Sequence, residues 1–243
     1  MARPITSRWS LRAPSFPSIG ANLGQNAGAL TYDVTGAYPL SLQTHPLAGE
    51  LPNTTVTFNG TAAPLFYVSP NQINAVVPYG VSTGSNASVI VSRDGVTSTP
   101  LTVAVKDTSP AVFAAANGTG QGAIFNVNTN TNPALLTYNG SSNPAPKGSY
   151  IEFFATGVGV WNPPVQDGSI NLFATNFTAK NISVTIGGQT APIYYAGSAP
   201  FEPWGMIQMI VIVPNGITSG QQALVLTIGQ NDNTKQKITL AVQ

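Results

Sequence analysis

The chain has 243 residues and a formal net charge of +1, and its 9 basic and 8 acidic residues make up only 7% of the sequence. Because so few cations can neutralise phosphates, the composition argues against nucleic acid and against an anionic membrane surface as partners. The absence of cysteine excludes disulfides and thiolate sites, and no apolar run approaches the roughly 20 residues that cross a bilayer.

Residues 1–17 are expected to form an N-terminal arm. The arm carries Arg3, Arg8 and Arg12 without an apolar stretch behind them, so it lacks the pattern of an intact signal peptide. Three alternatives remain for the location of the protein: the export signal is missing from this sequence, export follows another route, or the protein is not extracellular.

Short strand patterns follow the arm. Residues 18–24 are expected to be a shortened first strand. Apolar residues at 56–58 and 62–68 flank Asn59-Gly60, which predicts a hairpin because Asn-Gly accepts the positive φ of a type I′ turn. A second hairpin is predicted for residues 89–105.

The middle of the chain is more polar. Ser109–Phe113 is expected to begin a link between domains, and the glycine-rich run Gly118–Gly122 is expected to be a flexible turn. Residues 126–146, rich in Asn, Thr, Ser and Pro, predict a long polar loop. Residues 148–157 then predict the first full strand of the second half.

The most specific feature is an internal repeat. Residues 56–67 return as residues 184–195, at an offset of 128, and the second copy then carries eight extra residues. The alignment resumes where residues 72–78 face residues 208–214. A repeat longer than 100 residues indicates duplicated domains, because solenoid units recur every 20 to 50 residues.

The fold class follows from this repeat. Strand signals recur every 8 to 12 residues with Pro and Gly between them, which is typical of a β-sandwich. We therefore predict an all-β chain of two tandem immunoglobulin-like sandwiches, residues 18–108 and residues 109–243. The second sandwich also holds the linker and the loop insertions.

At the repeated residues the chain resembles the uncharacterised C-terminal domain family of secreted Solibacter-type acidobacterial proteins, which is related in fold to TIG/IPT immunoglobulin-like domains. The resemblance extends over roughly residues 18–243, and its most specific stretches are 57–81, 120–123, 144–159, 162–164, 167–168 and 184–220. It implies an exported pair of sandwiches without an established activity. The chain departs from the family pattern in lacking a large N-terminal module, in its short first strand, and in having Ile210 where the pattern places an amide, as at Asn74.

The candidate ligand-binding residues are aromatic side chains of the second copy. They are Trp161, Tyr194, Tyr195, Phe201 and Trp204. Exposed rings of this kind stack on sugar faces, because Trp and Tyr combine an apolar body with a polar handle. The alternative, which the sequence favours, is that Phe201 and Trp204 close one end of the sandwich or pack in the seam between domains.

Catalytic patterns are weak. The run Gly80–Gly84 matches G-x-S-x-G, but a strand is expected after it and Thr218 takes the serine position in the second copy, which favours a turn over a hydrolase site. Glu152, Asp167 and Glu202 could flank a bond as in glycoside hydrolysis. Chance proximity is the simpler interpretation of these three acids.

Metal-binding and modification patterns are weak too. His45 is the single histidine, and without cysteine it cannot make a usual zinc site. Residues 128–132 and 231–233 offer oxygen ligands for calcium but lack EF-hand spacing, so polar loops are expected. No cofactor is predicted. Seven N-x-S/T triplets would be glycan acceptors in a eukaryotic secretory path: Asn53, Asn59, Asn86, Asn117, Asn139, Asn176 and Asn181.

The sequence therefore predicts a non-catalytic, extracellular structural or adhesion protein that acts by self-association, as a subunit of a surface layer, matrix or filament. Net charge near zero offers little repulsion between copies, and sheet edges offer backbone groups for pairing. The alternative is a glycan-binding module whose second-copy aromatics hold an extracellular polysaccharide. An enzyme that uses Glu152 and Asp167 is a third hypothesis.

Overall fold

The computed structural model describes residues 29–30, 54–68, 72–116, 118–130, 135–175 and 181–243. Residue contacts divide the chain into two compact units. The first unit comprises the described parts of residues 1–107 together with 159–172 and 201–205, and the second comprises residues 108–158, 173–200 and 206–243. The sequence assigned 159–172 and 201–205 to the second domain, and the domain bounds stay predictions.

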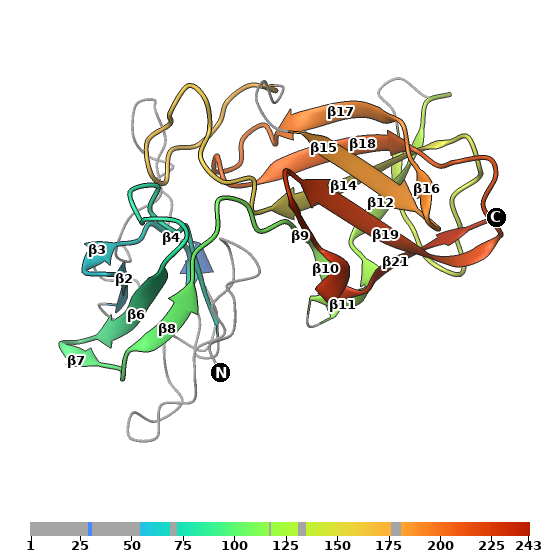
Figure 1. Ribbon diagram of the computed structural model, residues 1–243. Coiled ribbons are helices and arrows are strands. Elements are labelled where there is room, and N and C mark those ends of the chain that lie inside the picture. The colour runs from blue at the N-terminus through green and yellow to red at the C-terminus, as the bar shows by residue number, and fades with distance from the viewer. Residues whose placement is uncertain (1–28, 31–53, 69–71, 117, 131–134, 176–180) are drawn as a thin grey trace. The chain divides into compact units, whose positions relative to one another are not determined.

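The first unit contains two antiparallel sheets (Figure 1). One has the order β3-β2-β6-β7, with β8 also paired to β6, and the other has the order β1-β4-β5. Alternate residues of β2 and β6 are buried and pack with β4 and β5 in one core. The strands are β1 (Ala29–Leu30), β2 (Thr54–Phe58), β3 (Thr61–Ala62), β4 (Leu65–Val68), β5 (Ile73–Ala75), β6 (Asn86–Arg93), β7 (Val96–Thr97) and β8 (Leu101–Ala104).

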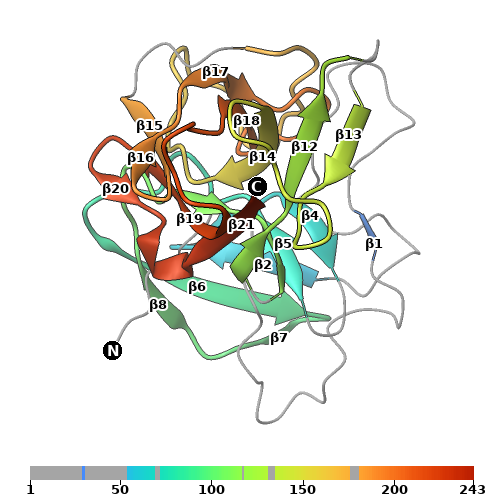
Figure 2. The same ribbon diagram turned by 90° about the vertical axis from the view of Figure 1, so that its right-hand side faces the viewer.

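The second unit contains two larger sheets that face each other. One follows β13-β12-β14-β18-β17, with β9 paired to β14, and the other follows β10-β11-β21-β19-β15-β16, with β20 paired to β19. Figure 2 shows β13 beside β12 at the border of its sheet. The elements are β9 (Ala111–Val112), β10 (Ala114–Ala116), β11 (Thr119–Gly122), β12 (Ile124–Asn128), β13 (Leu135–Tyr138), β14 (Tyr150–Thr156), β15 (Ile182–Ile186), β16 (Gln189–Thr190), β17 (Ile193–Ser198), β18 (Ile207–Ile212), β19 (Gly220–Ile228), β20 (Asn231–Asp232), η1 (Thr234–Gln236) and β21 (Ile238–Val242).

The core of the second unit lies between these sheets. Phe153 and Met209 from one sheet and Leu226 from the other are fully buried. One end is closed by the side chain of Asn139, which donates to the backbone oxygen of Ala241 and accepts from its backbone nitrogen, each at 2.9 Å. Because Asn139 follows β13 and Ala241 lies in β21, this buried amide joins the two sheets.

Both units contain the same hairpin, as the repeat predicts. The turn between β2 and β3 has φ values of 50° at Asn59 and 84° at Gly60. The turn between β15 and β16 has φ values of 57° at Gly187 and 78° at Gly188. Positive φ at both central residues is the type I′ geometry that matches the twist of paired strands. The hairpin predicted at residues 56–68 is confirmed and returns in the second copy, and the hairpin predicted at residues 89–105 is confirmed by the antiparallel pairing of β6 with β8.

A β-bulge is duplicated as well. In the first unit the pairing shifts between Leu65 and Tyr67 on β4. In the second unit the pairing shifts between Ile193 and Tyr195 on β17, at the same place in the repeat. Because the same irregularity recurs at the same offset, the repeat is structural as well as sequential. The chain is all-β, with two tandem immunoglobulin-like sandwiches.

The prediction for the middle of the chain is wrong in part. The expected link contains β9, the expected flexible turn is β11, and the expected polar loop overlaps β12 and β13. β12 was missed because Asn126, a polar residue, occupies an inward-facing position of the strand and interrupts its apolar pattern. Its Oδ1 accepts a hydrogen bond from Asn139 Nδ2 at 2.9 Å. The strand predicted at residues 148–157 is confirmed as β14.

Some predictions lie outside the described residues. These are the arm at residues 1–17, the short strand at 18–24, His45, and the triplets at Asn53, Asn117 and Asn176. Within the described residues, no helix is long and apolar enough to span a membrane.

Candidate binding face

The sheet β13-β12-β14-β18-β17 buries one side in the core and turns the other side outward. Cross-strand partners point to the same side of a sheet, and the register places Glu152 opposite both Phe125 and Ile210. Six aromatic residues lie on this outer side: Phe125, Tyr138, Tyr150, Phe154, Tyr194 and Tyr195. Four aliphatic residues accompany them: Val127, Leu136, Ile210 and Ile212. We call these ten residues, with Glu152 and Gln208, the aromatic face.

The rings of the aromatic face pack in two edge-to-face pairs. The centroids of Phe125 and Tyr138 are 5.7 Å apart at an interplanar angle of 88°, and those of Tyr150 and Tyr194 are 5.3 Å apart at 75°. Edge-to-face packing places the positive edge of one ring on the negative face of the other. Tyr194 is nevertheless 71% exposed and Tyr138 is 46% exposed, so the pairs hold these rings in place without covering them.

The bulge on β17 sets the position of two tyrosines. Tyr194 is the residue at which the pairing shifts, and Tyr195 next to it donates its hydroxyl to the backbone oxygen of Ser198 at 2.8 Å. A Cβ atom at Gly197 would lie 2.4 Å from the Tyr195 hydroxyl, so glycine is required beneath this ring. Burial raises the pKa of Tyr195, and hydrogen bonding with the Ser198 side chain and the Thr175 backbone opposes that shift.

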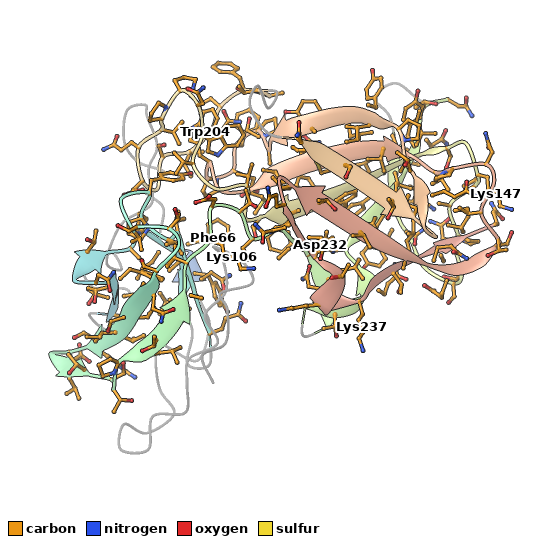
Figure 3. All side chains as sticks on the ribbon, in the orientation of Figure 1. Phe66, Lys106, Lys147, Trp204, Asp232 and Lys237 are labelled. Atoms are coloured by element: carbon orange, nitrogen blue, oxygen red, sulfur yellow. The ribbon has the colours of Figure 1, made fainter. Side chains whose placement is uncertain are left out.

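A hydrogen-bonded polar pair lies at the centre of the face. Gln208 Nε2 donates to Glu152 Oε1 at 2.8 Å, and Glu152 is 6% exposed. The other charged residues described in this unit lie in turns, in η1 or in β20: Lys147, Asp232, Lys235 and Lys237. Figure 3 labels three of them. Glu152 is therefore the one charged side chain described on the aromatic face.

The outer side of the opposite sheet has a different chemistry. The register pairs Ser183 with Thr227, Thr185 with Val225, and Ala223 with Thr239. These six side chains are small, and four of them carry hydroxyls. At the border of the sheet the register also places Asp232 opposite Thr227. We call this side the hydroxyl face.

Two loops of the first unit hold Trp161 and Trp204. Trp161 is 7% exposed, its Nε1 donates to the backbone oxygen of Trp204 at 2.6 Å, and the two ring centroids are 4.9 Å apart. The backbone nitrogen of Trp204 donates to Ser169, and Ile170 bridges to Pro203. Trp204, labelled in Figure 3, is half-buried. Trp161 thus packs within the loop pair. Its burial fits a structural role better than stacking on a sugar.

Phe201 and the acidic residues complete this loop pair. Phe201 is 74% exposed and has a φ of 63°, a left-handed conformation that is uncommon for a bulky residue. Burial raises the pKa of the neighbouring Glu202. Asp167 Oδ1 accepts a hydrogen bond from the backbone nitrogen of Tyr79 at 2.7 Å, so this carboxylate fastens a loop within the first unit.

A comparison with protein families bears on the first unit. The family model described as "IPT/TIG domain" matches residues 24–105. The chain contains a TIG/IPT domain. The TIG/IPT part of the resemblance is thereby confirmed, and the wider Solibacter-type family stays a prediction. No curated protein matches the chain.

The five predicted ligand-binding residues divide between the two units. Tyr194 and Tyr195 lie on the aromatic face of the second unit, whereas Trp161, Phe201 and Trp204 lie in the loops grouped with the TIG/IPT domain. The acids divide in the same way, because Glu152 belongs to the second unit, and Asp167 and Glu202 belong to the first.

Sequence reasoning missed most of the aromatic face. Four of its rings were not singled out: Phe125, Tyr138, Tyr150 and Phe154. The alternation Tyr150-Ile-Glu152-Phe-Phe154 in a strand was a usable signal, because it puts two rings and a carboxylate on one side. Phe125 and Tyr138 were hidden because their strands had been taken for a polar loop.

The remaining motifs have local roles. Residues 80–84 include turns followed by β6, as predicted, and lie in the TIG/IPT domain. Asn128 Oδ1 accepts from the backbone of Asn130, and Asn233 Oδ1 accepts from Leu226, so these amides close turns. The described residues hold no cluster of three or more His, Cys, Asp or Glu side chains that could bind a metal. Asn139 is fully buried, which leaves no room for a glycan on its amide.

Proposed function

We propose that this protein is a non-catalytic structural or adhesion protein of the cell surface or extracellular matrix, and that it acts by self-association through the aromatic face. The observation that carries the proposal is the composition of that face, with ten apolar or aromatic residues around one hydrogen-bonded charge. The external location is supported by the resemblance to exported proteins.

The composition of the face fits a protein interface. Interface cores are enriched in aromatic residues and depleted of charged ones such as Lys and Glu, and the aromatic face follows this pattern except at Glu152. Tyr194, Tyr138 and Leu136 are exposed by 71%, 46% and 43%. A contiguous apolar patch of this kind marks an interaction site more often than an ordinary surface.

A second copy of the chain is the partner that the charge favours. With a net charge of +1 and 17 charged residues in 243, two copies repel each other weakly, because proteins near zero net charge tend to associate. Among the residues that the structure describes, the aromatic face offers no cationic or anionic cluster that would select a strongly charged partner.

Sedimentation velocity over a range of concentrations tests this proposal. Ile212→Lys puts a charge on the aromatic face, and the matched control Thr185→Lys puts the same charge on a half-buried strand position of the hydroxyl face, opposite Thr190 and Val225. We expect wild type and Thr185→Lys to associate as concentration rises, and Ile212→Lys to stay monomeric. A monomeric wild type, or association of Ile212→Lys equal to wild type, would contradict the proposal. Melting curves check that both variants fold.

Glycan binding is a second candidate, favoured by the exposure of Tyr194. The ring is 71% exposed and is held edge-on by Tyr150, so it is pre-oriented to stack on a sugar. Affinity electrophoresis through polysaccharide gels tests this function. Retention that falls in Tyr194→Ala but not in Trp204→Ala would support it, whereas a wild type that migrates unretarded would reject it.

A further inference from the structure

The polar pair at the centre of the aromatic face has hydrogen-bonding capacity beyond its internal bond. Gln208 Nε2 carries two N–H groups, and one of them donates to Glu152 Oε1. A carboxylate accepts through two oxygens and about four lone-pair sites. Glu152 is already only 6% exposed in the single chain, and a partner that covers the face would remove the remaining water, which is costly for a carboxylate unless it is paired and hydrogen-bonded.

The position of the pair makes the face self-complementary. Glu152 lies on the middle strand β14, with Phe125 and Tyr138 in line with it on one side and Ile210 and Tyr195 in line on the other. Gln208 lies diagonally beside it on β18. Two copies related by a two-fold axis between their faces can therefore place each Gln208 opposite the other copy's Glu152.

This two-fold arrangement is the favourable one on electrostatic grounds. An axis that placed Glu152 opposite the same residue of a second copy would bury two carboxylates against each other, and like charges at an interface are strongly unfavourable. An axis that exchanges Glu152 and Gln208 gives each carboxylate a second amide donor. Closed two-fold dimers with one patch on both subunits are also the commonest form of homo-oligomer.

We propose that the aromatic face is an isologous dimer interface, and that Gln208 of each copy donates a hydrogen bond to Glu152 of the other. This inference rests on the proposed function and adds the partner's orientation to it. The apolar residues supply the contact, and the polar pair sets its register, because any other register leaves each carboxylate with the amide of its own chain as its one described donor.

The size of the face sets the expected strength of the dimer. Five strands at about 4.8 Å spacing span about 24 Å, and the seven residues of β14 at about 3.3 Å span about 23 Å. The projected area is about 550 Å² per copy, below the roughly 800 Å² per partner of a standard interface. We therefore expect a weak dimer in fast exchange with monomer.

Charge-exchange variants test the polar pairing. Gln208→Glu puts two carboxylates in each face, and the double variant Glu152→Gln with Gln208→Glu restores one carboxylate and one amide in exchanged positions. We expect Gln208→Glu to raise the dimer dissociation constant by more than about tenfold at neutral pH. We expect the double variant to return within a few-fold of wild type. The double variant also serves as the folding control, because it contains the same new carboxylate.

The outcomes separate this inference from the proposed function. If Gln208→Glu dimerises as tightly as wild type while Ile212→Lys is monomeric, self-association stands and the polar pairing is wrong. If the double variant remains as weak as Gln208→Glu although it folds, the pairing is also wrong. A wild type that stays monomeric at all concentrations overturns both.

Discussion

The two outer faces of the second unit arise from the same construction and have opposite chemistry. Both sheets place alternate residues in a common core, where Phe153 and Leu226 are equally buried. Outside, one sheet presents paired aromatic rings, and the other presents small residues such as Thr185 and Thr227. The core requires apolar residues on both inner sides, but it places no such demand on the outer ones. Packing of the core therefore does not account for the apolar residues of the aromatic face.

The two copies of the repeat differ at the same place. The duplicated bulge puts Phe66 in the first unit and Tyr194 in the second at equivalent positions. In the first unit Tyr67 pairs with Asn74, whose Oδ1 accepts from Gln72 at 2.8 Å. In the second unit Tyr195 pairs with Ile210. With isoleucine at the position of this amide, the second copy's face has an apolar residue between Glu152 and Tyr195.

Substitutions on the inner sides of the two sheets should cause the largest losses of unfolding free energy, and the losses should be similar for the two sheets. Phe153→Ala and Leu226→Ala each remove a fully buried side chain. We expect each to lower the free energy of unfolding by about 2–5 kcal/mol, because truncation loses burial and leaves a cavity. Urea denaturation measures both. A loss below about 1 kcal/mol for either would show that one sheet does not contribute to a shared core.

The next effect concerns the amide that joins the sheets. Asn139→Ala removes the acceptor of the Ala241 backbone nitrogen and the donor to Asn126 Oδ1. The Ala241 oxygen keeps its bond from the Ala145 backbone nitrogen. We expect a loss of about 3 kcal/mol, since each buried polar group left unsatisfied costs about 1–3 kcal/mol. The control is Asn181→Ala, an exposed asparagine whose backbone oxygen keeps its bond to Gly229. Equal unfolding midpoints for the two variants would contradict this assignment.

Substitutions on the two outer sides should cost different amounts of unfolding free energy, even in the monomer. Tyr150→Ala removes a half-buried ring that packs on Tyr194, and we expect a loss of about 1–2 kcal/mol from the ring pair and the lost burial. Thr227→Ala on the hydroxyl face should stay within about 0.5 kcal/mol of wild type. Chemical denaturation at low protein concentration measures the pair, and equal losses would remove the energetic distinction between the faces.

The smallest expected effect concerns Glu202, a half-buried carboxyl next to Phe201 in the loop pair. Burial raises the pKa of Glu202 above its usual 4.5. A carboxyl with a raised folded-state pKa stabilises the fold below its unfolded pKa and loses that contribution as pH rises through the folded pKa. Glu202→Gln should therefore be slightly more stable than wild type at neutral pH, with the difference shrinking below pH 4.5. A stability difference that is the same at pH 4 and pH 7 would contradict this cause.

The repeat made the fold predictable from the sequence. The aromatic face was not predictable, because it is formed by strand pairings between residues far apart in the sequence. The positions of β2, β3, β15 and β16 followed from turn residues and the offset, because I′ turns are encoded by two adjacent residues. β12 was missed because inward-facing Asn126 interrupts its apolar pattern, and its partner Asn139 is 13 residues away. Glu152 was noticed as an acid, but its partner Gln208 comes from β18, 56 residues later. Local patterns cannot supply such pairings.

Hydroxyl-radical footprinting at low and high protein concentration tests the central claim most directly. Tyr194 lies on the aromatic face, and Phe201, similarly exposed at 74%, lies outside it. The account predicts that oxidation of Tyr194 falls as concentration rises, while oxidation of Phe201 in the same sample is unchanged. Unchanged oxidation of Tyr194 under conditions where sedimentation shows association would place the contact elsewhere and contradict the account.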